Sequence, residues 1–254
     1  MKANSKLSLL ALVTALMTTA CGAPSNKPSN NPGKNDNFNI LTDLDDTYTI
    51  HTELQAKFLE YSGEYRSMPT TEYPDGDQFI SDPEPMKLSW ELDNENVTKY
   101  SVVFGQENDL GDGYEVMGTD KPEIDLYNVF LGTNYFYIKA YNGDEVIDES
   151  NVYTFDIDET CPRNLKIDGL TNCRDMGGRE LIGGGKIRQG MIYRTSGNNY
   201  QTKAGVQNVV GKGIISDAGK KEMLDHLKVK TEINVNDSNR YNLNLEGTNV
   251  KEVN

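Results

Sequence analysis

The sequence predicts two folded units in series: an antiparallel β-sandwich over residues 83–157 and an α/β unit over residues 161–254. The first unit consists of short alternating apolar and polar runs separated by turn residues, which is typical of a sandwich. The second combines strand-like runs with an amphipathic helical run. Charge separates them, because residues 1–160 hold 10 Lys and Arg against 29 Asp and Glu, whereas residues 161–254 hold 15 against 10.

The charge distribution also limits the classes of partner. The chain carries a net charge of −14, with its acidic excess in the first part. An acidic surface repels nucleic acid, so no nucleic-acid partner is expected, while the mildly basic second unit suits an anionic substrate. The simplest interpretation of the acidic excess is a solvated face that keeps an exported protein soluble.

Residues 1–21 predict an export signal. A basic start precedes an apolar run over residues 7–17 that is too short to span a bilayer, and small residues lead to Cys21. The run TTACG at 18–22 resembles a bacterial lipobox, whose cysteine is acylated, and ordinary cleavage after Ala20 is the alternative. Acylation of Cys21 would hold the protein on the outer face of the bacterial cell membrane as a lipoprotein.

Two segments connect the signal to the sandwich. Residues 22–47 predict a flexible tether, because residues 22–37 are rich in Pro, Ser, Asn and Gly. Residues 48–82 predict a helical and irregular lead-in, with apolar residues at helical spacing over 50–61. His51 has no partner at a metal-ligand spacing, so we interpret it as a surface or capping residue.

Within the sandwich we expect strands at residues 87–90, 99–104 and 134–141. Several aromatic residues lie on these strands and could be imagined as a sugar-binding platform. At strand spacing they are more often core residues and cross-strand pairs, and we interpret them so. They are Tyr100, Tyr135, Phe136, Tyr137 and Tyr141.

This unit resembles fibronectin type III domains. Pro83 and Pro85 lead into the single Trp90, and the run VFLGTNY at 129–135 resembles the corner before the penultimate-strand tyrosine, with Leu131 in place of proline. The resemblance implies a spacer or a ligand-binding module, and the fold alone does not choose between these roles.

The stretch 169–197 predicts a hairpin with charge at both ends. Arg174-Asp175 precedes two glycines, Leu181-Ile182 forms a strand-like pair before the glycines at 183–185, and a second strand ends in residues 194–196. Glycine permits positive φ and close backbone approach, so the stretch is a tightly specified turn structure rather than a linker.

These motifs resemble the bacterial tyrosine and lipid phosphatases of the Cys-x5-Arg type. The catalytic domain of that family opens with Asn-x-Arg-Asp-x-Gly-Gly, continues to a Gly-x-(Leu/Ile)-(Phe/Tyr)-Arg-Ser-like strand, and passes through a helix into an Asp-Leu-Arg strand. The resemblance runs from Asn164 to roughly Asn236. The matching positions are Asn172, Arg174, Asp175, Gly177, Gly178, the run 190–196 and the run 215–219.

The resemblance implies hydrolysis of a phosphomonoester through a cysteinyl-phosphate, without a metal or other cofactor. In the family the nucleophilic cysteine and the general-acid aspartate follow the Asp-Leu-Arg strand. We therefore expect both downstream of Asn254, so that 161–254 is the N-terminal part of an incomplete tyrosine-phosphatase-like domain and this chain alone is inactive. The residues that the resemblance assigns to support of the pocket are Asn172, Arg174, Asp175, Arg194 and Ser196.

Two interpretations of these pocket residues stay open. One is that Arg174 and Asp175 form a fixed ion pair that braces the pocket floor, and the other is that they are an ordinary, partly exposed pair of little energetic weight. We favour the brace, with no direct catalytic role for either residue.

Residues 173–179 also satisfy Cys-x5-Arg by spacing, but the chemistry requires more. A phosphate-binding loop needs a helix N-terminus, whose dipole holds phosphate and lowers the cysteine pKa. After Arg179 the sequence reads as a strand and a turn, and Asn172 stands where the family's active loop has His. We interpret Cys173 as a buried, apolar position. A disulfide between Cys161 and Cys173 is conceivable in an exported protein, but we favour two free thiols.

The last part of the chain predicts a loop, a helix and a strand. Residues 198–213 predict an inserted loop at the pocket rim. Ser216 is expected to cap a helix whose apolar face holds Met223 and Leu227, with His226 facing solvent. Residues 229–235 are expected to form a buried strand.

This strand departs from the family pattern. Asn234-Val235-Asn236 stands where Asp-Leu-Arg is expected, so two amides replace a charged pair. The change indicates either an inactive protein or a divergent enzyme.

Two functions follow from these observations. The first is a membrane-anchored phosphatase that acts on a phosphorylated protein or lipid, with no choice among phosphotyrosine, phosphoinositide and other phosphomonoesters. The second is a non-catalytic, lipid-anchored binding or adhesion protein that carries a phosphatase-like remnant.

Overall fold

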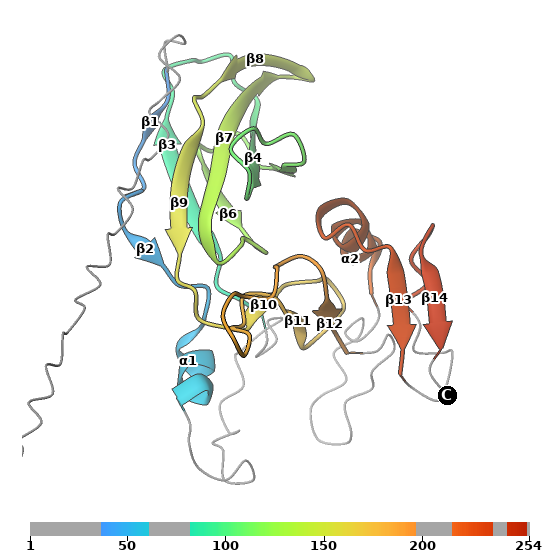
Figure 1. Ribbon diagram of the computed structural model, residues 1–254. Coiled ribbons are helices and arrows are strands. Elements are labelled where there is room, and N and C mark those ends of the chain that lie inside the picture. Colours follow the sequence, from blue (N-terminus) through green and yellow to red (C-terminus); the bar gives the residue numbers. More distant parts are fainter. Residues whose placement is uncertain (1–36, 61–81, 197–214, 236–242, 253–254) are drawn as a thin grey trace, which may run out of the picture.

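The computed structural model describes residues 37–60, 82–196, 215–235 and 243–252 of the chain. Figure 1 shows a strand-rich part that carries β1 to β9 and a smaller part, with β10 to β14 and α2, at one end of it. Some predictions fall outside the described residues. They concern the export signal and lipidation site at 1–21, the tether up to residue 36, the inserted loop at 198–213 and the amide of Asn236.

Two sheets build the strand-rich part. The smaller sheet has the order β1-β3-β6 and is antiparallel. The larger has the order β2-β9-β7-β4-β5, with β8 added to β7, and is antiparallel except for the parallel pair β2-β9. The bounds are β1 Asn39–Ile40, β2 Thr47–Tyr48, β3 Met86–Glu91, β4 Lys99–Gly105, β5 Tyr114–Met117, β6 Glu123–Leu126, β7 Gly132–Asn142, β8 Glu145–Glu149 and β9 Tyr153–Ile157.

One apolar core joins these two sheets. Alternate residues of β3 and β7 point into it, so that Trp90 from one sheet and Phe136 from the other are 1% and 0% exposed. The three strands expected at 87–90, 99–104 and 134–141 lie within β3, β4 and β7 and are confirmed.

The expectation for the five aromatic residues is met in part: two lie in the core, whereas Tyr135, Tyr137 and Tyr141 are half-buried. Tyr100 and Phe136 are core residues, and Tyr100 contacts Trp90 edge to face with ring centroids 5.2 Å apart. Tyr141 lies on the outer face, where it donates a hydrogen bond of 2.6 Å to Glu115. The ammonium of Lys139 lies 5.6 Å from the ring centroid of Tyr137.

The tether ends earlier than expected. Phe38 is 5% exposed and belongs to the core, and β1 and β2 pair with β3 and β9. Residues 38–48 therefore belong to the folded part, with two short strands at 39–40 and 47–48, so the folded part begins before residue 47. Backbone hydrogen bonds and one buried aromatic ring hold these edge strands in place. Strands of two residues are too short to show alternation, so little in the sequence indicates them.

The expected helix is α1, Glu53–Glu60. Thr52 Oγ1 accepts a hydrogen bond from the backbone N–H of Gln55, and Gln55 Oε1 accepts one from the N–H of Thr52, which is a capping box with glutamine at the third helical position. His51 is not a surface residue, because it is 6% exposed and its Nε2 lies 2.9 Å from the carbonyl of Pro162. In the described ranges no helix has both the length and the apolarity to cross a bilayer.

The smaller part has a sheet of its own. The antiparallel order is β10-β11-β12, and β13 pairs with β14 in parallel. Helix α2 continues into π-helical turns, η2, and packs on a second apolar core that includes Leu165, Met223 and Leu227. The bounds are β10 Arg163–Leu165, β11 Cys173–Asp175, β12 Tyr193–Arg194, α2 Asp217–Lys221, η2 Glu222–His226, β13 Thr231–Asn234 and β14 Asn249–Glu252.

Two predictions for this part have different outcomes. Ser216 caps α2 as expected, since its hydroxyl accepts a hydrogen bond of 3.0 Å from the N–H of Gly219. Strand β13 exists but is not buried, because Ile233 and Val235 are 63% and 76% exposed and Asn234 is the buried residue. Among the described residues β13 pairs with β14 alone, so nothing there covers the apolar side of the strand.

Gly219 lets α2 lie close against the turn between β10 and β11. A Cβ on this residue would lie 2.3 Å from the carbonyl oxygen of Asp168. Gly→Ala inside a helix ordinarily stabilises by about 0.5–1 kcal/mol, but here the clash reverses the sign. We predict that Gly219→Ala lowers the free energy of unfolding in urea. Gly111→Ala is the matched control, because its Cβ would meet nothing closer than 3.7 Å, and an equal loss in both variants would contradict the prediction.

Candidate functional site

A buried ion pair lies at the centre of the β10-β11-β12 sheet. The antiparallel register of β10 and β11 places Arg163 opposite Asp175. Their Nη1 and Oδ2 atoms lie 2.9 Å apart, and both side chains are 0% exposed. Each of these two charges requires the other, because a buried ion without a partner lowers the stability of the fold by several kcal/mol.

Asp175 also holds the two ends of the hairpin together. Its Oδ1 accepts a hydrogen bond of 2.8 Å from the N–H of Gly177, and its Oδ2 accepts one of 2.7 Å from the N–H of Gly190. Residue 177 must be glycine, because a Cβ there would lie 2.4 Å from the Cα of Gln189. The Asp-x-Gly spacing is thus explained: the Asp175 carboxylate binds the N–H of the glycine two residues later, where the two strands of the hairpin are too close together for a side chain.

Arg163 connects the same carboxylate to the strand-rich part. Its Nε donates to the carbonyl of Val129 at 2.9 Å, and its Nη2 donates to the carbonyl of Asn128 at 2.6 Å. The guanidinium also lies over the ring of Phe130, 4.1 Å from the centroid. Burial lowers the pKa of Arg163, but an arginine keeps its charge at physiological pH. One side chain therefore joins the hairpin to the corner at 128–130.

The expected ion pair between Arg174 and Asp175 is wrong. Adjacent residues of a strand point to opposite faces of the sheet, so Asp175 faces Arg163 in the interior while Arg174 lies on the other face. There Arg174 donates a hydrogen bond to the side chain of Asn172. Asp175 does form a bracing ion pair, as the resemblance implied, but its partner is Arg163 and not Arg174.

The remaining pocket residues gather on the far side of β11. Arg194 lies directly opposite Arg174 in the β11-β12 register, so both guanidinium groups belong to one face of the sheet. Ser196 exchanges two hydrogen bonds with Thr171, one through its backbone N–H at 3.0 Å and one through its hydroxyl at 3.1 Å. Asn172 adopts a positive φ of 57° at the turn into β11. Two cations side by side make this face suited to an anion.

Cys173 has none of the properties of a nucleophile. It is 2% exposed, lies in the interior of β11, and its Sγ is 2.9 Å from the hydroxyl of Thr195. Burial raises the pKa of Cys173 to about 12, against the opposing effect of the Thr195 hydrogen bond. The chain continues from Arg179 into the isolated bridge between Glu180 and Lys186 rather than into a helix. Cys161 and Cys173 are both free thiols.

A second buried polar cluster joins η2 to the strand-rich part. Glu222 is its centre, because it accepts hydrogen bonds from the hydroxyl of Tyr114 at 2.7 Å and from the amide of Asn128 at 2.5 Å. Its Oε1 also lies 2.8 Å from Nδ1 of His226. The side-chain oxygen of Asn128 accepts a hydrogen bond of 2.7 Å from the backbone N–H of Lys166, so the Asn128 amide connects the strand-rich part to the smaller part.

His226 therefore does not face solvent as expected. Its side chain is 3% exposed and stacks on the ring of Tyr114, with centroids 4.0 Å apart and planes 7° apart. The apolar face of the helix, read alone, ends at Met223 and Leu227. Tyr114, from the end of the strand-rich part, also covers the side of the helix that carries His226, and the helix sequence alone does not reveal this contact.

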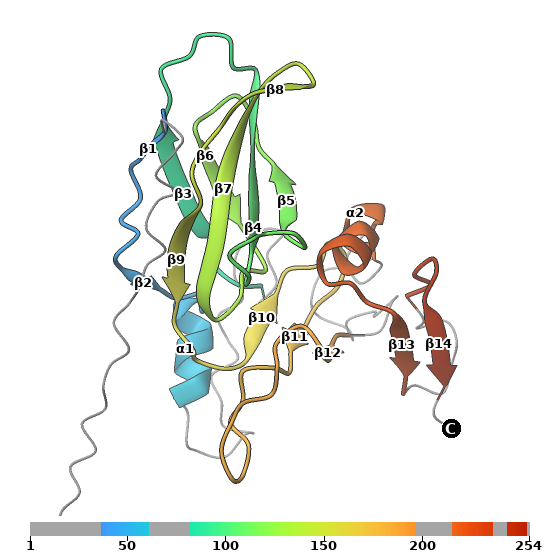
Figure 2. The same ribbon diagram turned by 45° about the horizontal axis from the view of Figure 1, so that its top comes forward.

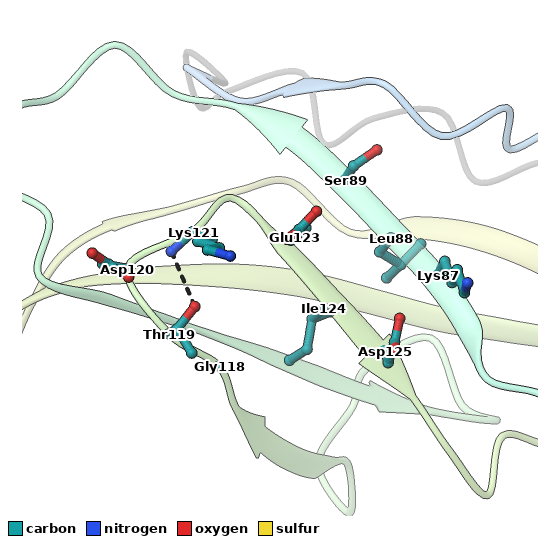
Figure 3. Close-up of a pocket in the computed structure, with 10 residues that line it drawn as sticks. All are labelled: Lys87, Leu88, Ser89, Gly118, Thr119, Asp120, Lys121, Glu123, Ile124 and Asp125. Atoms are coloured by element: carbon teal, nitrogen blue, oxygen red, sulfur yellow. Dashed lines mark hydrogen bonds between the residues drawn. The ribbon is translucent and has the colours of Figure 1, made fainter. Parts of the chain in front are cut away.

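A hollow of about 600 Å³ belongs to the strand-rich part alone. Its lining residues are drawn in Figure 3. It lies along β3 and β6, and none of the pocket residues named above lines it. Its lining mixes both signs of charge, and the residues are Lys87, Leu88, Ser89, Gly118, Thr119, Asp120, Lys121, Glu123, Ile124 and Asp125. In the part of the chain that the structure describes, no three His, Cys, Asp or Glu residues gather as a metal site.

Sequence reasoning missed Arg163, Asn128 and Glu222. A signal for Arg163 exists, because its alternation with Leu165 and Ile167 places it on the inward face, and a buried arginine implies an acidic partner. No spacing links Asn128 to its partner Lys166, which is 38 positions away in the chain. Glu222 and His226 are four residues apart on the helix, which is a local signal, but Tyr114, the other partner of Glu222, is 108 positions away.

Comparison with known proteins gives one match. A model of the tyrosine phosphatase family matches residues 165–218. No curated protein and no solved structure matches the chain. Residues 165–218 therefore form a tyrosine phosphatase-like region, which supports a phosphatase-like hydrolase in general terms. The match contains Asp175 and its glycines, whereas Arg163 lies just before it.

Removal of the buried cation tests its role. We predict that Arg163→Ala lowers the free energy of unfolding by about 3–5 kcal/mol, because the Asp175 carboxylate is left buried without its partner. Urea unfolding followed by circular dichroism measures this. Arg188→Ala is the control, since it removes an exposed arginine from the same hairpin and should change stability by less than about 0.5 kcal/mol. Similar losses in the two variants would contradict the proposed brace.

The buried histidine predicts a pH dependence. Burial lowers the pKa of His226 below its ordinary value of 6.5, although Glu222 opposes the shift. The unfolded chain then binds a proton at a higher pH than the folded chain, so stability is complete above about pH 6.5 and falls as the pH drops below it. The chain has only two histidines, so proton NMR can assign both imidazole signals.

We predict that one imidazole signal titrates below pH 6.5 and disappears in His226→Phe. The same substitution should flatten the loss of stability between about pH 7 and pH 5.5. His51→Phe serves as the matched control, because it removes the other buried imidazole. An unchanged slope in His226→Phe would assign the acid sensitivity to other groups.

Proposed function

We propose that this chain is the front part of a surface-anchored phosphatase of the tyrosine or lipid phosphatase type. One observation carries the proposal: Asp175 binds Gly177, Gly190 and Arg163, and so shapes the hairpin that the tyrosine phosphatase family model matches. Its buried hydrogen bond to Gly177 accounts physically for the Asp-x-Gly part of the motif. The substrate is a phosphorylated protein or lipid.

The described residues would support a phosphate pocket rather than perform its chemistry. Arg174 and Arg194 offer two cations on one face of the small sheet, and Asn172 positions one of them. Guanidinium groups bind phosphate oxygens through paired N–H donors. Ser196 fixes the end of β12 through its two bonds to Thr171.

The reaction that the resemblance implies needs three further groups, which we assign to residues after Asn254. A cysteine thiolate attacks phosphorus, the bond from phosphorus to the leaving oxygen breaks, and an aspartic acid protonates that oxygen. An arginine and the loop amides stabilise the charge of the transition state. Water then hydrolyses the phosphocysteine. No metal takes part in this scheme.

The remaining parts would place this chemistry outside the cell. We assign residues 83–157 to a fibronectin type III-like sandwich that acts as a spacer or binding module, and Cys21 to acylation on the outer face of the bacterial membrane. The two facing sheets with one shared core support the sandwich assignment. The short apolar run and small residues before Cys21 support the anchor.

One observation favours a second candidate, a lipid-anchored binding protein with a phosphatase-like remnant. Asn234 is 4% exposed at the position where the family pattern has an aspartate. An amide there removes a buried charge that would support a pocket. Binding of polysaccharide or of a host protein by the intact chain, without turnover, would favour this candidate.

We predict that this chain does not hydrolyse p-nitrophenyl phosphate, because the Cys173 thiol is buried and protonated at neutral pH. A chain extended by the in-frame codons that follow Asn254 should hydrolyse it. The extension should contain a His-Cys-x5-Arg loop within roughly one further domain's length.

Alanine in place of the cysteine of that loop should abolish turnover in the extended chain, whereas Cys173→Ser should leave it intact. Turnover by the present chain that is lost in Cys173→Ser would refute the assignment of the nucleophile. An extension without such a loop would leave the binding protein as the better candidate.

A further inference from the structure

The hairpin between β11 and β12 exposes large apolar residues at its tip and its base. Leu181 and Ile182 at the tip are 49% and 109% exposed, and Met191 and Ile192 at the base are 63% and 59% exposed. Figure 2 shows this hairpin projecting away from the larger sheets, beyond β10 and β11. Scattered single apolar residues on a surface are ordinary, but two consecutive pairs in one hairpin require an explanation.

The tip is held in place by the backbone. The backbone N–H of Leu181 donates to the carbonyl of Gly185 at 2.9 Å, and that of Ile187 donates to the carbonyl of Arg179 at 2.8 Å. The two arms of the hairpin are therefore hydrogen-bonded to each other as far as the tip. Glycines 183–185 all have positive φ. A Cβ on any of them would have nothing within 4 Å, so open space surrounds the turn. The tip therefore presents Ile182 fully and Leu181 about half to solvent.

Cations surround these apolar residues. Residues 176–194 contain Arg179, Lys186, Arg188 and Arg194 against the single acid Glu180, and all five are exposed. Lys186 pairs with Glu159. Within the ranges that the structure describes, the other three cations form no ion pair. This basic surface contrasts with the strongly acidic first part of the chain.

We propose that the hairpin at 176–194 docks on an anionic lipid bilayer, with Leu181 and Ile182 inserted among the acyl chains and the arginines against the headgroups. Apolar side chains flanked by Lys and Arg are the combination that binds membrane interfaces. The charges decide the partner, because an apolar tip alone would suit a protein groove equally well. Arg179 and Arg188 of the same hairpin, which form no ion pair among the described residues, match a surface of continuous negative charge.

The inference is independent of phosphatase activity and of acylation at Cys21. It adds a second contact to the lipid anchor of the proposed function. It would also bring the small sheet close to the membrane surface.

A tryptophan at the tip tests this contact. Trp90 is the only native tryptophan and is 1% exposed, so its emission is a constant background. The full chain with Cys21→Ser, which cannot be acylated, would carry Ile182→Trp or, as the control, Met117→Trp, a position 52% exposed on β5. Each is mixed with vesicles of phosphatidylcholine and phosphatidylglycerol, with and without brominated acyl chains.

We expect the emission of Ile182→Trp to shift to the blue and to be quenched by brominated lipid, while that of Met117→Trp stays unchanged. Vesicles of phosphatidylcholine alone should have little effect. Adding Arg179→Gln and Arg188→Gln should weaken binding by at least about tenfold, since each basic residue near an anionic surface contributes separately. Both reporters share the same N-terminal segment, so any contact made by that segment is common to them.

Three results would overturn the proposal. Absence of quenching at Ile182→Trp in anionic vesicles would show that the tip does not enter the bilayer. Equal quenching of both reporters would assign the contact to another segment. A blue shift that grows with protein concentration in the absence of lipid would show that a second copy of the chain covers the tip. None of these results depends on phosphate hydrolysis, so they leave the proposed function to its own test.

Discussion

The buried pair of Arg163 and Asp175 is the interaction on which the arrangement of the smaller part depends. Asp175 binds both ends of the hairpin through Gly177 and Gly190, and Arg163 binds the corner at 128–130. Neither side chain is exposed, so each ion requires the other. A single contact thereby couples the conformation of the phosphatase-like hairpin to the position of the strand-rich part.

The Glu222 cluster repeats this arrangement on the other side of the contact. There the Glu222 carboxylate accepts hydrogen bonds from Tyr114 and Asn128 of the strand-rich part and contacts His226 on its own helix. The two clusters share Asn128, whose carbonyl binds Arg163 and whose amide binds Glu222. Buried polar groups that each bind several partners specify one geometry, because any displacement would break several hydrogen bonds at once. The small sheet is thus held in a defined orientation against the corner at 128–130.

This rigid arrangement has a consequence for function. The interior face of the small sheet is occupied by the ion pair and by Cys173, so the proposed phosphate pocket would lie on the opposite face, where Arg174 and Arg194 are side by side. The hairpin that joins their strands carries its own exposed apolar and basic residues. Substrate support and membrane contact would therefore be properties of the same short segment, which the buried Asp175 keeps in shape.

The sequence by itself determined what depends on near neighbours: the alternation of β3, β4 and β7, the Ser216 cap of α2, the glycine-rich turn, and the motif order that identified a phosphatase-like region. Only the tertiary structure decided which cation pairs with Asp175, where His226 and His51 lie, and that β1 and β2 extend the two sheets. The reason is physical. Periodicity and capping act over a few residues, whereas a buried charge takes whichever partner the docked surfaces bring opposite it.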